Sequence, residues 1–330
     1  MAGTATAAAA APPPQKNPNA YSVRWFQGMA GAAVFSLAYI LTPLYMLSIP
    51  IAFLVLPLYT AVVYTLPMLI SAIIPCQHAP GLVKQLQPIA DSYFQYDQVA
   101  ELSDDDIRDL LKEGKKFILA FQPHGVISFT GMCAAIKAPD DLRPLKTAVA
   151  SSLMKTPILK HVMGVFGFVD ASKSSLKKHF KNPGLNGSVA IYVGGIAELF
   201  KSSLTEERLF LSKRKGFIKL ALTQGVDVVP AYLFGNTSIL SVMTSGPLAN
   251  LSRSTGVALT YFWGKWLLPI PRDDALLYAR GKPLGMPHIA EPTQEDIDKW
   301  HGKYCKEVER LFNTYKERVP QYKHKKLYID

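Results

Sequence analysis

Three apolar runs between residues 117 and 234 are each followed at once by polar residues and glycines. Gln122-Pro123-His124-Gly125 follows Phe117–Phe121, Gly194-Gly195-Ile196-Ala197-Glu198 follows Ser188–Val193, and Gly235-Asn236-Thr237 follows Asp227–Phe234. Short continuous apolar runs are typical of strands buried on both faces of a parallel sheet, and ligands bind beyond the carboxyl ends of such strands. We therefore expect a histidine, a carboxylate and an amide to meet at one edge of a sheet.

His124 is the one histidine of seven that stands at such a strand end. An imidazole titrates near neutral pH, which suits a general base. Pro123 fixes the angle at which the chain enters the loop. Gly125 leaves its backbone N–H unshielded, so it could stabilise a developing oxyanion. The alternative is a histidine that only caps the following helix.

Two charged groups accompany this histidine. Glu198 would orient the imidazole or hold a substrate hydroxyl; alternatively, it only interacts favourably with the dipole of a helix N-terminus. The basic segment 213–220 contains Lys215 and Lys219, which are four residues apart and therefore share one helix face. Cationic side chains at a helix N-terminus favour phosphate binding. The alternatives are a solvated surface or a surface that rests on anionic lipid headgroups.

Strands and helices alternate along this part of the chain. We predict the strands Phe117–Phe121, Thr147–Ser151, Ser188–Val193 and Asp227–Phe234, the helices 128–137, 152–162 and 213–223, and an edge strand at Ala275–Arg280. A long helix begins after Thr293, which with Asp296 forms a capping signal, and runs to about Arg318. The fold class is α/β, with a largely parallel sheet flanked by helices.

The strongest physical signal lies before this domain. From Trp25 to Val83, 59 consecutive residues include no Asp, Glu, Lys or Arg. One membrane span needs about 20 residues, so the run predicts a helical hairpin with spans at about 30–48 and 51–74 and a turn at Pro50. Arg24 precedes the hairpin and a net-positive region follows it, so both ends are expected on the cytosolic side. The alternative is an apolar hairpin buried in a soluble fold.

The chain is thus divided into a disordered Ala/Pro-rich tail (1–24), a membrane hairpin (25–83) and a membrane-associated domain (84–330). The net charge is +11, but neither an arginine-rich tail nor zinc-finger spacing accompanies it, which disfavours nucleic acid as a partner. The three cysteines lack metal-binding spacing, so we expect reduced thiols and no metal site.

The order of five segments resembles the diacylglycerol acyltransferase type 2 family, over about residues 85–320. The segments are QPHG, VGGIAELF, RKGFIKLAL, VVPAYLFGN and PTQEDID. In the family the QPHG segment reads H-P-H-G, so Gln122 replaces a histidine. Of the two histidine positions in the motif, only His124 is therefore expected to be catalytic. Related acyltransferases carry an Asp five residues after the histidine, where this chain has Phe129.

The resemblance implies a glycerolipid-acyltransferase-like fold and a set of site residues. His124 and Glu198 would be catalytic, and the substrate-binding residues would be Gln122, Pro123, Gly125, Gly194, Gly195, Arg214, Gly216, Phe217, Lys219 and Asn236. The family's R-x-G-F-x-K motif corresponds to Arg214, Gly216, Phe217 and Lys219. A neutral-lipid-binding F-L-x-L motif corresponds to Phe53, Leu54 and Leu56.

The resemblance further implies acyl transfer from acyl-CoA to diacylglycerol, which forms triacylglycerol without a covalent intermediate or a cofactor. The partners would be acyl-CoA, diacylglycerol and membrane lipids, in the endoplasmic reticulum membrane with the domain facing the cytosol. Monoacylglycerol or a long-chain alcohol as acceptor, a non-catalytic lipid-droplet or membrane-shaping protein, and Cys133 as a covalent acyl carrier are alternatives. Association with lipid droplets and assembly into a homo-oligomer stay open.

Overall fold

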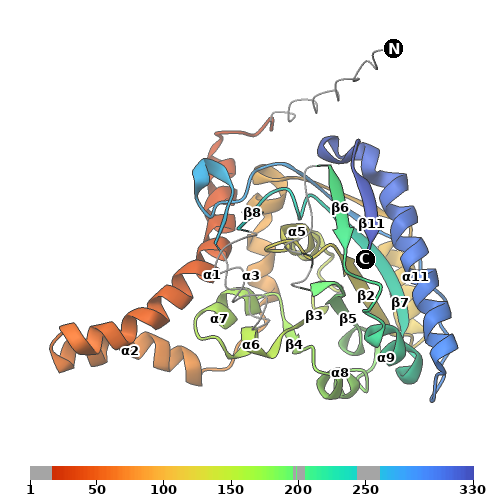
Figure 1. Ribbon diagram of the computed structural model, residues 1–330, viewed down its shortest axis with the longest axis horizontal. Coiled ribbons are helices and arrows are strands. Elements are labelled where there is room, and N and C mark those ends of the chain that lie inside the picture. The colour runs from red at the N-terminus through yellow and green to blue at the C-terminus, as the bar shows by residue number, and fades with distance from the viewer. Residues whose placement is uncertain (1–16, 196–197, 199–204, 244–260) are drawn as a thin grey trace, which may run out of the picture.

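The protein is built around a seven-stranded sheet (Figure 1). The computed structural model describes residues 17–195, 198, 205–243 and 261–330, so residues 1–16 of the predicted tail lie outside it. In spatial order the strands are β1 (Gln95–Ala100), β10 (Ala275–Arg280), β7 (Asp227–Phe234), β2 (Phe117–Gln122), β5 (Val189–Tyr192), β3 (Lys146–Val149) and β4 (Phe168–Asp170). The strands from β7 to β4 are parallel, whereas β10 runs antiparallel to β7. The predicted largely parallel α/β sheet is confirmed.

Strand β10 has the predicted bounds but is not an edge strand. It lies between β7 and β1, and β1 pairs with it along its whole length, from Gln95–Ala275 to Ala100–Arg280. The edge prediction was wrong because the sequence of β1, QYDQVA, is mainly polar and half exposed. An outer strand of this kind lacks the apolar run that reveals a buried strand.

Other helices and strands complete the domain. The helices are α3 (Pro80–Gln85), α4 (Asp104–Lys112), α5 (Phe129–Lys137), α6 (Ser151–Lys155), α7 (Leu159–Gly164), α8 (Lys173–His179), α9 (Gly216–Gln224) and α11 (Gln294–Tyr315). Shorter turns are the π-helix η1 (Ile89–Tyr93) and the 3₁₀ turns η2 (Gly184–Gly187), η4 (Lys265–Leu267), η5 (Lys316–Arg318) and η6 (Pro320–Tyr322). Two small sheets pair β6 (Glu206–Leu209) with β11 (Lys326–Ile329) and β8 (Ser241–Val242) with β9 (Phe262–Trp263).

The helix boundaries follow local chemistry. Helix α11 begins as predicted, because the Thr293 hydroxyl accepts the Asp296 N–H and the Asp296 carboxylate accepts the Thr293 N–H. The helix predicted through residue 162 is two helices, because Pro157 disfavours helical backbone at the residue before it. Helix α9 begins at Gly216, three residues later than predicted.

The sheet has a hydrophobic core on each face, and β7 contributes to both. Val228, Tyr232 and Phe234 belong to the core formed with α9 and α11. Val229, Ala231 and Leu233 belong to the core on the α4 side. Because successive side chains of a strand point to opposite faces, the unbroken apolar run of β7 fits a strand covered on both sides.

The N-terminal hairpin consists of α1 (Val23–Val55) and α2 (Leu58–Ile73). The predicted turn at Pro50, and with it the bounds of both spans, was wrong: Pro43 and Pro50 are both accommodated inside α1. The turn lies at Leu56–Pro57, where Leu56 is extended (φ −106°, ψ 155°) because the residue before a proline avoids helical backbone.

The two halves of α1 have different surroundings. In the first half, Trp25, Gly28, Ala32 and Phe35 are buried in a core shared with η1 and α7. A side chain at Gly28 would place its Cβ 2.3 Å from the Pro88 carbonyl oxygen, so only glycine allows this contact. The second half projects from the domain with α2 (Figure 1).

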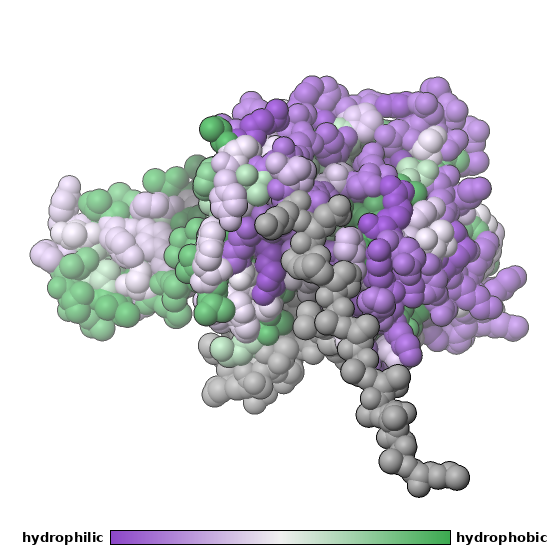
Figure 2. All heavy atoms as spheres, turned by 90° about the horizontal axis from the view of Figure 1, so that it is seen from above, coloured by the Kyte–Doolittle hydropathy of each residue, from purple (hydrophilic) through white to green (hydrophobic). Residues whose placement is uncertain are grey.

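The projecting hairpin is apolar and exposed, and it forms the largely green and white lobe in Figure 2. Within the described residues, α1 is the one helix long and apolar enough to cross a membrane, judged by length and composition. Helix α2, with 16 residues, is a shorter apolar helix.

Candidate active site

The structure brings His124, Glu198 and Asn236 together at one edge of the sheet. They follow β2, β5 and β7, which are adjacent and parallel in the order β7-β2-β5, so their carboxyl ends point the same way. The convergence that the sequence predicts therefore follows from the observed topology.

Asn236 holds the loop that carries His124. Its buried amide Nδ2 donates hydrogen bonds to the carbonyl oxygens of Pro123 (3.1 Å) and His124 (3.3 Å) and to the Ser128 Oγ (2.8 Å). Its Oδ1 accepts the backbone N–H of Thr130 at 2.9 Å. One amide thus fixes both the loop and the first turn of α5. The sequence indicated Asn236 but gave no signal for Ser128 and Thr130.

Gly125 makes this close approach possible. Its backbone φ is +65°, in the left-handed region, and a Cβ there would lie 2.4 Å from the Asn236 carbonyl oxygen. Among the described residues, its N–H has no hydrogen-bond acceptor. The residue after the histidine therefore carries a backbone donor that no described residue pairs with.

The His124 ring has a defined tautomer and orientation. Its Nδ1 lies 2.6 Å from the Gly125 carbonyl oxygen, and because a carbonyl can only accept, Nδ1 carries the proton. Nε2 is then unprotonated, and within the described part of the chain it has no hydrogen-bond partner. The Tyr192 ring packs edge-to-face against the imidazole, with 4.9 Å between ring centroids. Burial lowers the pKa of His124, which favours the neutral ring.

Glu198 contacts the backbone of the histidine loop rather than the imidazole. Its Oε2 accepts the His124 N–H at 2.9 Å, and its Oε1 accepts the Phe210 N–H at 3.3 Å. Burial raises the pKa of Glu198 to about 7, and nearby Glu207 adds to the rise, whereas Arg214 and the two backbone bonds oppose it. A Cβ at Gly194 would lie 1.8 Å from Oε1, so that glycine makes room for the carboxylate.

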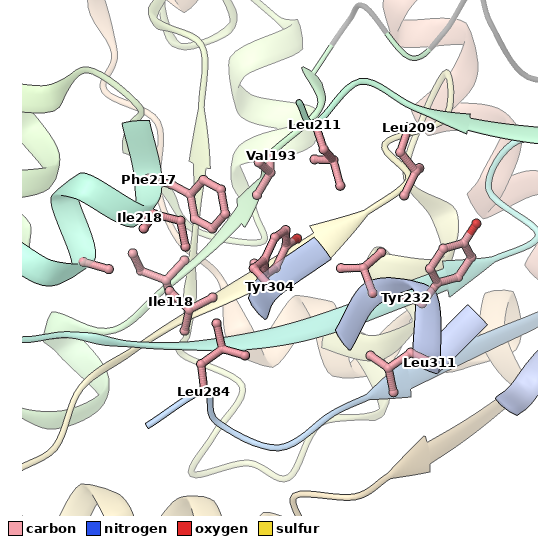
Figure 3. Close-up of a cluster of buried hydrophobic side chains, with 14 of the residues drawn as sticks. Ile118, Val193, Leu209, Leu211, Phe217, Ile218, Tyr232, Leu284, Tyr304 and Leu311 are labelled. Carbon is pink, nitrogen blue, oxygen red and sulfur yellow. The ribbon is translucent and has the colours of Figure 1, made fainter. Parts of the chain in front are cut away.

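Gln122 is fully buried below the site. Its Nε2 donates to the Tyr304 hydroxyl of α11 at 3.2 Å, while its Oε1 has no hydrogen-bond partner in the part of the chain that the structure describes. Tyr304 also packs against Phe217, with 4.9 Å between ring centroids. Phe217, a predicted substrate-binding residue, thus lies in the core beside α11 (Figure 3).

The other predicted residues have varied positions. Arg214 and Lys219 are exposed, with the Arg214 guanidinium 5.3 Å from the Phe210 ring centroid. Lys215 pairs with Asp298 (2.7 Å) and Gly216 begins α9. Pro123 follows a cis peptide bond, and Gly195 has φ +65°. Phe53, Leu54 and Leu56 lie near the tip of the hairpin, and the structure does not bring them to His124.

A second buried polar cluster supports the edge, and sequence reasoning missed it. The Lys325 ammonium pairs with the fully buried Glu207 at 2.7 Å. Glu207 also accepts the Thr237 hydroxyl at 2.5 Å, and the Tyr322 hydroxyl accepts the Gly235 N–H at 3.0 Å. These contacts tie the C-terminal segment to the loop that carries Asn236. Partners 30 to 118 residues apart leave no local sequence signal.

Helix α1 also approaches the site. Trp25, Ala32 and Phe35 of α1 belong to the same hydrophobic core as Ile127 and Phe129, which follow the histidine loop closely in the chain. The first half of α1 is therefore packed into the core next to this loop. Among the described residues, no group of three His, Cys, Asp or Glu side chains could hold a metal ion.

This arrangement defines an α/β protein that carries a histidine at the carboxyl edge of its sheet and a projecting apolar hairpin at its N-terminal side. The sequence model of the family described as "Diacylglycerol acyltransferase" matches residues 50–330, and the chain belongs to this family.

Several named proteins are similar to the chain. A diacylglycerol O-acyltransferase 2 from Dictyostelium discoideum is 31% identical, over 61% of this chain and 66% of that protein. A diacylglycerol O-acyltransferase 2 from Danio rerio is 28% identical, over 63% of each. A human 2-acylglycerol O-acyltransferase 3 is 30% identical, over 63% of this chain and 66% of that protein. Each match spans less than two thirds of the relative's length.

A solved structure of a 1-acyl-sn-glycerophosphate acyltransferase from Thermotoga maritima aligns with a TM-score of 0.42 and 12% identity. The alignment covers 88% of this chain and 99% of that one.

Proposed function

We propose that this chain transfers a fatty acyl group from acyl-CoA to the free hydroxyl of diacylglycerol and so forms triacylglycerol. The observation that carries the proposal is the His124 imidazole, whose Nδ1 is committed to the Gly125 carbonyl and whose Nε2 accepts no hydrogen bond from any described residue. Family membership and relatives named for this reaction support the choice of substrates.

The reaction needs one proton to be moved twice. His124 Nε2 takes the proton of the acceptor hydroxyl as the oxygen attacks the thioester carbonyl. The Gly125 N–H stabilises the resulting oxyanion. When the intermediate collapses, the C–S bond breaks, and the imidazolium returns its proton to the departing coenzyme A thiolate. No covalent enzyme intermediate is required, and Cys133, fully buried inside α5 with a pKa raised by burial, is poorly suited to be one.

Glu198 acts as a positioning residue in this mechanism. It holds the backbone N–H of His124 and so fixes the loop that carries the base. Arg214 and Lys219, which are exposed near this edge, would attract the coenzyme A phosphates. The Gln122 amide, in place of the family histidine, supports the loop from below through Tyr304.

The hairpin would place this site at a membrane surface. Helix α2 is 16 residues long, or about 24 Å at 1.5 Å per residue, which is short of the roughly 30 Å hydrocarbon core. We therefore propose that the hairpin enters the bilayer from the cytosolic side and returns to the same side without crossing the membrane. The location would be the endoplasmic reticulum, with the domain 84–330 on the cytosolic side and a glycerolipid-acyltransferase-like active site facing the lipids.

The experiment is a transfer assay with purified chain in vesicles that contain diacylglycerol and labelled acyl-CoA. His124→Ala is expected to reduce triacylglycerol formation by about 10²–10⁴-fold, because it removes the general base. His288→Ala, which alters an exposed histidine, is the matched control. Undiminished synthesis by His124→Ala would end this mechanism.

Monoacylglycerol is the second candidate acceptor, because one relative is named 2-acylglycerol O-acyltransferase 3. The same vesicles, supplied in parallel with diacylglycerol, monoacylglycerol or a long-chain alcohol, distinguish the acceptors by the labelled product. A chain that inserts into vesicles but acylates none of the three would be a non-catalytic membrane protein.

A further inference from the structure

A second exposed apolar surface lies outside the hairpin, at the turn that follows β9. Trp266, Leu267 and Leu268 expose 63%, 73% and 48% of their surfaces. Three consecutive large apolar side chains, each with about half or more of its surface exposed, are unusual on a soluble domain.

The backbone of this turn is held in a conformation that such residues avoid. Trp266 has φ 52° and ψ 29°, and Leu267 has φ 59°, both in the left-handed region. The turn is closed by the Gly264 N–H, which donates to the Leu268 carbonyl, and the Lys265 N–H, which donates to the Ile270 carbonyl, both at 2.7 Å. Backbone strain of this kind persists where the surroundings enforce it, often at functional sites. Here it fixes apolar side chains in an exposed position.

The turn is anchored to the beginning of α1. The Lys265 ammonium pairs with Asp273 at 2.7 Å and lies 4.7 Å from the centroid of the Trp25 ring. The Trp25 indole N–H donates to Asp273 at 3.0 Å. Because Trp25 is fully buried, this three-residue contact fixes the turn relative to α1.

An exposed apolar stripe runs along the first half of α1 toward the hairpin. Val23, Phe26, Ala30 and Val34 are all exposed, and their spacing of three, four and four residues places them on one helix face. In Figure 1, the light-blue segment around residue 265 lies on the side of the domain from which the hairpin projects.

We propose that Trp266, Leu267 and Leu268, together with Val23 and Phe26 at the beginning of α1, form a second membrane contact that inserts into the headgroup region of a phospholipid bilayer. Tryptophan is favoured at this depth, and the exposed cation of Arg24 suits phosphate headgroups. The choice of a lipid surface as the occupant rests on the proposed insertion of the hairpin. Two contacts would fix the tilt of the domain, which one hairpin alone leaves free.

The test uses the full chain with Cys76→Ser, Cys133→Ala and Cys305→Ser as background. An environment-sensitive fluorophore is attached at Leu267→Cys, at Leu54→Cys in the hairpin, or at Lys282→Cys on the exposed surface. Each protein is reconstituted in phosphatidylcholine vesicles with and without nitroxide-labelled lipids. We expect lipid nitroxides to quench the label at positions 267 and 54 and to leave position 282 unchanged.

The outcomes separate this inference from the proposed function. Quenching at 54 without quenching at 267 overturns the second contact and leaves the hairpin in the membrane. Absence of quenching at both positions overturns membrane insertion as well. A label at 267 that is shielded from water but insensitive to lipid nitroxides would indicate a protein partner and would also overturn the proposal. Adding Trp266→Ser and Leu268→Ser to the 267-labelled chain should reduce its quenching, while the same changes leave the label at 54 quenched.

Discussion

The carboxyl edge of the sheet and the N-terminal hairpin have opposite organisations. At the edge, polar side chains such as Gln122, Glu198 and Asn236 are buried and hydrogen-bonded to backbone groups or to other side chains. In the hairpin, apolar side chains such as Leu54 and Leu47 are exposed, by 85% and 69%. Each region reverses the usual rule for its residue type. The comparison teaches that the domain pairs its polar groups in its interior, whereas the hairpin leaves its apolar side chains uncovered, and that α1 joins the two regions.

We expect the largest effect on stability from a substitution in the buried polar cluster that supports the sheet edge. Lys325→Met leaves the fully buried Glu207 carboxylate without its counter-charge, which should lower the free energy of unfolding by about 3–5 kcal/mol. Denaturant unfolding of the purified chain in detergent measures this change in the free energy of unfolding.

The matched control is Lys323→Met, because Lys323 is exposed two residues away. The double variant Lys325→Met/Glu207→Gln should recover part of the loss, since the uncompensated charge is gone. An unchanged unfolding free energy in Lys325→Met would show that the C-terminal segment does not support the site.

The proposed lipid contact of the apolar hairpin is tested by introducing a charged side chain into it. Leu44→Arg places a guanidinium on an exposed apolar face of α1, at a cost of about 2.5–3.5 kcal/mol in the hydrocarbon region, or roughly 10²-fold in the insertion equilibrium. The measurement is the fraction of protein that stays with membranes after alkaline extraction. Leu44→Ala should remain membrane-bound. Full retention of Leu44→Arg would contradict the assignment of this face to lipid.

The burial of Glu198 at the sheet edge predicts that the stability of the protein depends on pH. Its pKa is about 7 in the folded protein, against 4.5 for an ordinary glutamate, so the folded state keeps the proton to higher pH than the unfolded chain. The stabilisation from the protonated carboxyl is complete below about pH 4.5 and is lost as pH rises through 7, by up to about 3 kcal/mol.

Glu198→Gln removes this contribution, so the difference in unfolding free energy between wild type and variant should change across the window from pH 4.5 to 7 and be constant above it. Denaturant titrations at several pH values provide the measurement. A difference that does not vary with pH would show that Glu198 titrates normally.

The smallest effect concerns the exposed cations. Arg214→Ala should raise the KM for acyl-CoA about fivefold, in keeping with the roughly 1 kcal/mol of an exposed charge interaction, with little change in kcat. Lys213→Ala, at the neighbouring exposed position, is the control. Equal KM values for both variants would show that Arg214 has no special part in binding the coenzyme A phosphates.

Much of the fold could be predicted because the signals are local. The apolar run of β7 is covered on both faces and has the predicted bounds, and the Thr293–Asp296 pair caps α11 as its spacing indicates. The meeting of His124, Glu198 and Asn236 follows from parallel order alone, once the three strands are recognised.

What could not be predicted depends on long-range contacts or on local exceptions. The polar strand β1 has no apolar pattern, so the sequence does not reveal that β1, and not β10, is the edge strand. Pro50 resembles a turn residue, yet the helix continues through it and ends before Pro57. The Lys325–Glu207 pair joins residues 118 positions apart, and only the folded chain reveals that both are buried.

Helix α1 is continuous from the domain to the tip of the hairpin, over 33 residues or about 50 Å. On the proposed insertion of the hairpin, a change in the angle of its outer half within the bilayer would be passed along α1 to Trp25, Ala32 and Phe35, which share a core with Ile127 and Phe129 beside the histidine loop. Bilayer thickness would then affect the proposed acyl transfer. Vesicles made from short-chain and long-chain phospholipids should support different turnover rates at the same surface density of acceptor.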